Sequence, residues 1–76
     1  MTYQELLEIL RAELRLSDVS GTEEMGKTQG WDSLRQVSLM FAIEKASGTS
    51  VPPDMFGELT SVEAIWEFLA EEGLAS

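Results

Sequence analysis

The hydroxyl group of Ser33 is the group in this sequence that is best placed for chemistry. It lies in the segment Gly30-Trp31-Asp32-Ser33-Leu34, directly after a flexible loop and in the first turn of a predicted helix. Serine is also common at helix starts, where its side chain caps a free backbone amide. By itself the Asp-Ser-Leu triplet therefore favours a structural cap, and its context has to decide between a cap and a reactive group.

The rest of the sequence offers few groups for catalysis. It contains no His and no Cys, so the commonest general base, the usual soft metal ligand and the thiol nucleophile are missing. Neighbouring acidic pairs such as Glu23-Glu24 and Glu71-Glu72 point different ways on a helix, which is typical of a solvated surface. We therefore expect a protein that has no catalytic residues and no metal site.

Length and charge narrow the class of protein further. The 76 residues predict one domain spanning 1–76, because so short a chain buries too little surface for two cores. The net charge of −9 argues against nucleic acids and anionic membranes as partners. The start of the chain lacks the features of a secretory signal, and no apolar run approaches the roughly 20 residues of a membrane span. We expect a soluble, cytoplasmic monomer.

Two long segments have apolar residues at every third or fourth position and are predicted to form amphipathic helices. The first helix is expected over residues 3–16. The second begins near Asp32, whose carboxylate can cap the first turn, and runs to about Ser47, where Gly48 ends it. Residues 17–30 between them are predicted to form a loop, and loops of about this length tend to be functional or disordered.

Two further helices are predicted in the remaining sequence. Pro53 suits the first position of a short helix. Thr60 and Glu63 have the spacing of a capping box, at the start of a closing helix that ends at Gly73. The predicted fold is therefore all-α: a small four-helix bundle with a long loop between the first and second helices and a short third helix.

The second predicted helix has two apolar stripes, although a bundle helix needs only one. One stripe is expected in the core, against Leu10, Leu14, Ile65 and Leu69, and consists of Leu39, Met40, Ile43 and Ala46. The other lies roughly 150° away around the helix axis and consists of Leu34, Val37 and Phe41. The short helix from Pro53 could cover this second stripe, or the stripe could stay exposed as a docking surface.

The residues around Ser33 resemble the signature of acyl carrier and peptidyl carrier proteins. The resemblance rests on Asp32-Ser33-Leu34 with Val37, Leu39 and Ile43-Glu44 following. It extends to Val51-Pro52 and Leu59-Thr60-Ser61-Val62, which are similar to the third and fourth helices of that family at the expected distance. Together with the first helix and the loop, the resemblance covers essentially the whole chain.

The resemblance implies that a phosphopantetheinyl transferase uses coenzyme A to attach a covalent 4'-phosphopantetheine arm to Ser33. It also implies that Asp32 helps to hold the metal ion during this transfer. Physical chemistry supports the location, because a phosphodiester at a helix N-terminus meets free amides and the positive end of the helix dipole. Such a protein is not an enzyme: it carries thioester intermediates and is a substrate for its partner enzymes.

The resemblance further implies that the outward side of the second helix meets these partners. The expected docking residues are Leu34, Arg35, Val37 and Phe41. The expected partners, beside the transferase, are a loading enzyme, either an adenylating ligase or an acyltransferase, and downstream condensing or tailoring enzymes. Met40, Phe56 and Ile65 could line a small internal cavity for the carried group.

The second helix departs from the carriers of bacterial fatty acid synthesis, where this helix is usually strongly acidic. Here Arg35, Gln36, Ser38 and Lys45 stand among its outward positions. A charge reversal of this kind can reject a partner. We therefore expect a carrier of a specialised pathway, such as polyketide or nonribosomal peptide synthesis. The alternative is an unmodified helical adaptor that binds a partner protein through Leu34, Val37 and Phe41.

Overall fold

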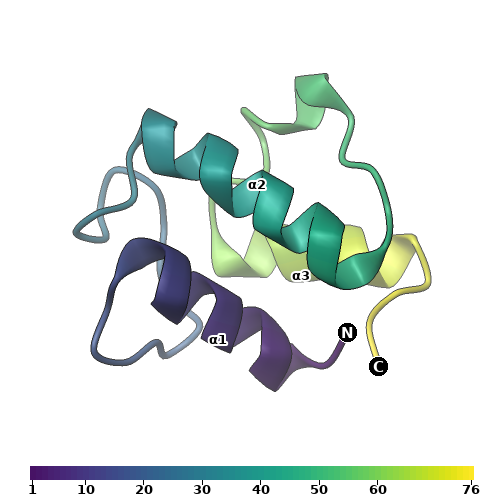
Figure 1. Cartoon of the computed structure of the whole chain (residues 1–76), viewed down its shortest axis with the longest axis horizontal. Helices are drawn as coiled ribbons and strands as arrows, with labels where there is room; N and C mark the ends of the chain where they lie inside the picture. Colours follow the sequence, from purple (N-terminus) through teal and green to yellow (C-terminus); the bar gives the residue numbers. More distant parts are fainter.

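Three α-helices and one short 3-10 helix make up the regular structure of the computed structural model, which describes all 76 residues. They are α1 (Tyr3–Leu14), α2 (Ser33–Ser47), η1 (Pro53–Met55) and α3 (Val62–Glu71). Figure 1 shows α2 crossing in front of α3, with α1 beside them. The predicted all-α fold is confirmed. None of these helices is long and apolar enough to cross a membrane.

The predicted short third helix is reduced to the single 3-10 turn η1. Pro53 occupies the start of η1, as its fixed φ favours, and the glycine at position 57 disfavours continuation of a helix beyond this turn. The turn closes with Met55 N donating to Pro52 O at 2.9 Å, and Gly57 follows at once. The chain therefore has three α-helices where the sequence predicts four helices.

Side-chain caps begin both α1 and α2, and the cap at Asp32 lies where the sequence predicts it. Thr2 and Glu5 form a capping box, in which the Glu5 amide donates to Thr2 Oγ1 at 3.1 Å and the Thr2 amide donates to Glu5 Oε1 at 2.7 Å. Asp32 Oδ1 accepts a hydrogen bond from Arg35 N at 2.9 Å at the start of α2. Both caps satisfy amides that have no partner within the helix.

The cap of α3 differs from the prediction by one residue. Ser61 is the N-cap, and its Oγ accepts a hydrogen bond from Ala64 N at 3.0 Å. The predicted capping box of Thr60 and Glu63 is wrong. The helix begins one residue later because the backbone before it is paired with the long loop. Thr60 O accepts a hydrogen bond from Met25 N at 2.8 Å, and the chain stays extended through Ser61.

The long connection between α1 and α2 is tied to the start of α3. Glu24 and Ser61 form an isolated antiparallel bridge, and Val62 N donates to Glu23 O at 3.1 Å beside it. The connection therefore follows a defined path across the bundle before it reaches Asp32, as Figure 1 shows. Its last residue before the cap, Trp31, is only 2% exposed and is part of the core.

The core is built where the apolar periodicity predicts it. All three helices contribute, and the buried residues of α1, α2 and α3 include Leu6, Leu10, Leu14, Leu39, Met40, Ile43, Val62, Ile65, Phe68 and Leu69. Ala46 is exposed, so its predicted place in the core is wrong. It lies in the last turn of α2, where a single methyl group is too short to reach the packed interior.

The corrected cap of α3 can be tested by substitution. Ser61→Ala should lower the free energy of unfolding by about 1 kcal/mol, because the amide of Ala64 loses its acceptor. The matched control Thr60→Ala should have a smaller effect, since only the backbone of Thr60 is used. Urea unfolding followed by circular dichroism measures both values, and a larger loss in Thr60→Ala than in Ser61→Ala would contradict the assignment.

Candidate functional site

Ser33 is the first residue of α2, and its side chain is exposed. The capping position belongs to Asp32, which has an extended backbone with φ −119° and ψ −174° and accepts the Arg35 amide through Oδ1. The hydroxyl of Ser33 is therefore not used as the cap of its helix. The interpretation of this serine as a structural cap is not supported, and its oxygen faces solvent at a helix end.

The same helix end offers hydrogen-bond donors to an anion. The amides of Ser33 and Leu34 lie in the first turn, where no carbonyl of the helix precedes them, and the first backbone bond of α2 runs from Gln36 N to Asp32 O at 2.9 Å. These amides and the positive end of the helix dipole favour a negatively charged group nearby. The residues present thus fit a phosphate ester on Ser33 Oγ, although the Asp32 carboxylate beside it is a like charge.

The chain on the loop side of Ser33 is fixed by close packing. Gly30 has φ +85°, and a Cβ atom there would lie 3.0 Å from Leu14 O at the end of α1. The indole Nε1 of the buried Trp31 donates to Gln36 Oε1 at 2.7 Å. A glycine lets the chain pass the end of α1, and the indole anchors the next residue. The exposed hydroxyl of Ser33 therefore follows directly after a well-packed part of the chain.

The stripe of Leu34, Val37 and Phe41, called the apolar stripe below, is exposed. The exposed fractions of these side chains are 78%, 41% and 57%, and no other large hydrophobic residue of the chain is exposed. The expectation that the stripe stays open is confirmed. The segment after η1 contacts the stripe at Phe41, whose ring meets that of Phe56 edge to face with centroids 6.0 Å apart.

Arg35 differs from the other predicted docking residues because it is partly buried. Its Nη1 donates to Glu13 O near the end of α1 at 3.4 Å. Glu44, further along α2, is also engaged, since its Oε2 accepts a hydrogen bond from Val51 N at 2.6 Å. The structure brings Asp32, Ser33 and the apolar stripe together on the open side of α2, and it directs Arg35 partly toward α1.

Gln36 is the single buried polar residue of the chain, at 3% exposure, so its predicted place among the outward positions of α2 is wrong. Its Nε2 donates to Phe56 O and to Leu59 O, both at 2.8 Å, while its Oε1 accepts the Trp31 indole. The available signal was its spacing, because positions 36, 40 and 43 lie on one side of a helix. A glutamine on the core side of α2 predicts a buried hydrogen-bond network.

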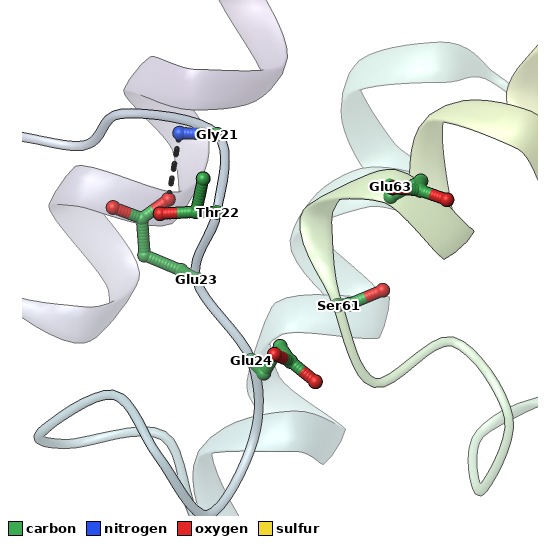
Figure 2. Close-up of a pocket in the computed structure, with 6 residues that line it drawn as sticks. All are labelled: Gly21, Thr22, Glu23, Glu24, Ser61 and Glu63. Carbon is green, nitrogen blue, oxygen red and sulfur yellow. Dashed lines mark hydrogen bonds between the residues drawn. The ribbon is translucent and has the colours of Figure 1, made fainter.

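A hollow in the surface lies away from Ser33, between the long loop and the start of α3. This hollow of about 360 Å³, shown in Figure 2, is lined entirely by small, polar and acidic residues: Gly21, Thr22, Glu23, Glu24, Ser61 and Glu63. No group of three His, Cys, Asp or Glu side chains is arranged to hold a metal ion. The hollow is therefore an acidic part of the surface.

The carboxylate of Glu23 in this hollow holds its own loop. It accepts hydrogen bonds from the amides of Ser20 and Gly21, each at 2.8 Å, and Figure 2 shows the second of these as a dashed line. Partial burial acts to raise the pKa of Glu23, but the hydrogen bonds from these amides outweigh it, so the pKa lies below its ordinary value of 4.5. The charged form of this side chain therefore stabilises the loop.

Comparison with known protein families gives a match that spans most of the chain. A family model described as "Phosphopantetheine attachment site" matches residues 4–69, which include all three α-helices up to the last turn of α3. A search of the curated proteins found no match.

The role of Glu23 predicts a pH dependence of stability. Because its pKa is lower in the folded than in the unfolded protein, its contribution is present above the unfolded pKa and is lost as the pH falls through the folded pKa. Glu23→Gln should therefore lower the free energy of unfolding at pH 7 more than at pH 3. Urea titrations at both pH values measure this difference. Glu63→Gln, an exposed residue across the hollow, is the control, and equal losses at both pH values in Glu23→Gln would contradict the assignment.

Proposed function

Because the chain belongs to the phosphopantetheine attachment site family, we propose that it is a carrier protein whose 4'-phosphopantetheine arm is attached to Ser33. Domains of this family are the site of covalent 4'-phosphopantetheine attachment, and they are generally non-catalytic carriers of substrates. The observation that supports Ser33 most strongly is its exposed hydroxyl at the first position of α2, beside a separate capping residue. The arm supplies a terminal thiol that holds the carried group as a thioester.

The residues around Ser33 prepare its oxygen for transfer. Ser33 Oγ forms the new ester bond to phosphorus as the bond to the leaving adenosine bisphosphate breaks, and the hydroxyl proton passes to a base of the transferase. Asp32 uses Oδ1 in the cap, so its other carboxylate oxygen is left to help hold the transferase metal ion. Free amides at the start of α2 then stabilise the phosphodiester.

The apolar stripe is proposed as the surface that docks the transferase, a loading enzyme and downstream condensing or tailoring enzymes. It adjoins Ser33 along α2, so a partner that covers the stripe has its reactive groups near the arm. Exposed apolar residues next to a functional group mark protein interaction sites. The two acidic and two basic residues of α2 and its cap cancel in charge, so docking is governed by apolar contact first, with Arg35 adding a contact at the edge of the stripe.

A specialised pathway, such as polyketide or nonribosomal peptide synthesis, fits the charge pattern of α2 best. Lys45 is exposed and Arg35 is partly exposed on this helix, where fatty acid carriers are typically acidic. Basic side chains at a docking surface reject partners that are built for an acidic helix. We also propose that residues 1–76 form one carrier domain, with η1 in the place of the short third helix of that family.

The second candidate function is a protein adaptor without an arm. It is supported by the exposure of the apolar stripe, which is the only group of exposed large hydrophobic residues. The adaptor and the carrier make opposite predictions for Ser33, because only the carrier uses its hydroxyl.

Attachment of the arm provides the direct test. Incubation with coenzyme A and a phosphopantetheinyl transferase should add the mass of one phosphopantetheine group to the protein, as measured by intact mass spectrometry. Ser33→Ala should abolish the addition, because the accepting oxygen is gone. The control Ser38→Ala removes an exposed hydroxyl from the same helix and should be labelled like the natural protein. A natural protein that no transferase labels would exclude the carrier function.

Docking through the apolar stripe is tested by Phe41→Ala. The Kd for the transferase should rise about tenfold, since truncating an aromatic anchor commonly costs more than 1 kcal/mol of binding free energy. Fluorescence anisotropy measures Kd, and Ser38→Ala on the same helix is the control. An unchanged Kd in Phe41→Ala would show that the stripe is not used. Binding of a partner that needs Phe41 in a protein that never receives an arm would instead identify the adaptor.

A further inference from the structure

The side chain of Gln36 joins three separate parts of the molecule directly beneath the attachment site. It lies one turn after Ser33, about 4.5 Å further along the helix axis at 1.5 Å per residue. Its carbonyl oxygen accepts the indole of Trp31, which precedes the site, and its amide group donates to the backbone of Phe56 and Leu59, which follow η1. All its hydrogen-bonding groups are engaged, and no buried side-chain nitrogen or oxygen of the chain lacks a partner.

These hydrogen bonds join the start of α2 to the segment 56–59. A hydrocarbon chain that entered the bundle here from Ser33 would have to separate Gln36 from its partners. One indole N–H and two backbone carbonyls would then lie against a group that can neither donate nor accept a hydrogen bond. Leaving buried polar groups without partners is unfavourable, so this part of the bundle resists an apolar chain.

The interior behind Gln36 is already filled by side chains. Of the three residues that the sequence suggested as walls of an internal cavity, Met40 and Ile65 are completely buried in the core and Phe56 is partly buried against it. The four hollows of the surface are lined by other residues, and neither Met40 nor Ile65 borders any of them. A long chain could enter only by displacing core residues, and the hydrogen bonds of Gln36 hold the segment 56–59 against the movement that this requires.

We propose that Gln36 acts as a clasp that keeps the carried group outside the bundle, which suits this protein to short or polar acyl groups and not to long hydrocarbon chains. The inference rests on the proposed carrier function and on the attachment of the arm at Ser33. A short or polar group loses little by remaining in water. A long alkyl chain gains nothing from this carrier, because the apolar interior is closed to it.

The clasp is tested on the protein loaded with either an acetyl or a dodecanoyl arm. The ¹H–¹⁵N resonances of the Trp31 indole and the Gln36 side-chain amide should coincide in the two forms. Their hydrogen-exchange rates should agree within about twofold, because neither chain opens the network. The indole of Trp66, which packs edge to face on Tyr3 at 5.2 Å, serves as the internal reference. Displacement or faster exchange of the Trp31 and Gln36 signals only in the dodecanoyl form would overturn the clasp.

A substitution then tests whether Gln36 itself excludes the chain. Gln36→Met keeps a side chain of similar length without hydrogen bonds, so the dodecanoyl arm should now shift the methyl resonances of Met40 and Ile65 relative to the acetyl arm. The control Gln4→Met changes an exposed glutamine of α1 and should show no such difference. Identical core resonances in the two loaded forms of a folded Gln36→Met would overturn the role of Gln36.

Two measurements separate a failure of the clasp from a failure of the carrier function. If Gln36→Met does not fold, the comparison of loaded forms of the natural protein still decides the proposal, because it needs no variant. Intact mass is measured first in every case. A missing adduct overturns the carrier function and the clasp together, whereas a loaded protein with displaced Trp31 signals overturns the clasp alone.

Discussion

The hydrogen bond from the Arg35 amide to Asp32 Oδ1 is the contact on which the site depends. A helix needs a cap at its start, and a serine in this region would ordinarily provide it. Because Asp32 takes the capping position, Ser33 becomes the first helical residue and its oxygen is left exposed. The free amides of the same turn remain available to an anion. The Asp32 carboxylate thus caps the helix and leaves the Ser33 hydroxyl free.

The second constraint is the support beneath that turn. Trp31 and Gln36 lie on either side of Asp32 and Ser33 in the sequence, and they are joined by the bond from the indole to the side-chain amide. Both are nearly inaccessible to solvent, at 2% and 3% exposure. Since Gln36 also holds the segment after η1, the loop, α2 and the approach to α3 are fixed relative to one another at the site. A rigid base lets a mobile arm swing from a defined point.

The surface divides into regions with different properties. The apolar stripe and the hydroxyl of Ser33 share the open side of α2, whereas the hollow of Glu23, Glu24 and Glu63 lies between the long loop and the start of α3. Docking by apolar contact and repulsion of anionic surfaces by the net charge of −9 can therefore operate together. This division agrees with the carrier function that we propose.

The sequence by itself determined the all-α class, both long helices, the cap at Asp32 and the two apolar stripes of α2, because these features depend on local periodicity and capping chemistry. The tertiary structure decided that the apolar stripe stays open, because local periodicity does not determine whether a distant segment covers a helix face. It also moved the cap of α3 to Ser61, because pairing with the distant Met25 fixes the backbone of Thr60. The clasp at Gln36 likewise joins residues up to 23 positions apart, and local sequence patterns do not specify contacts over such separations.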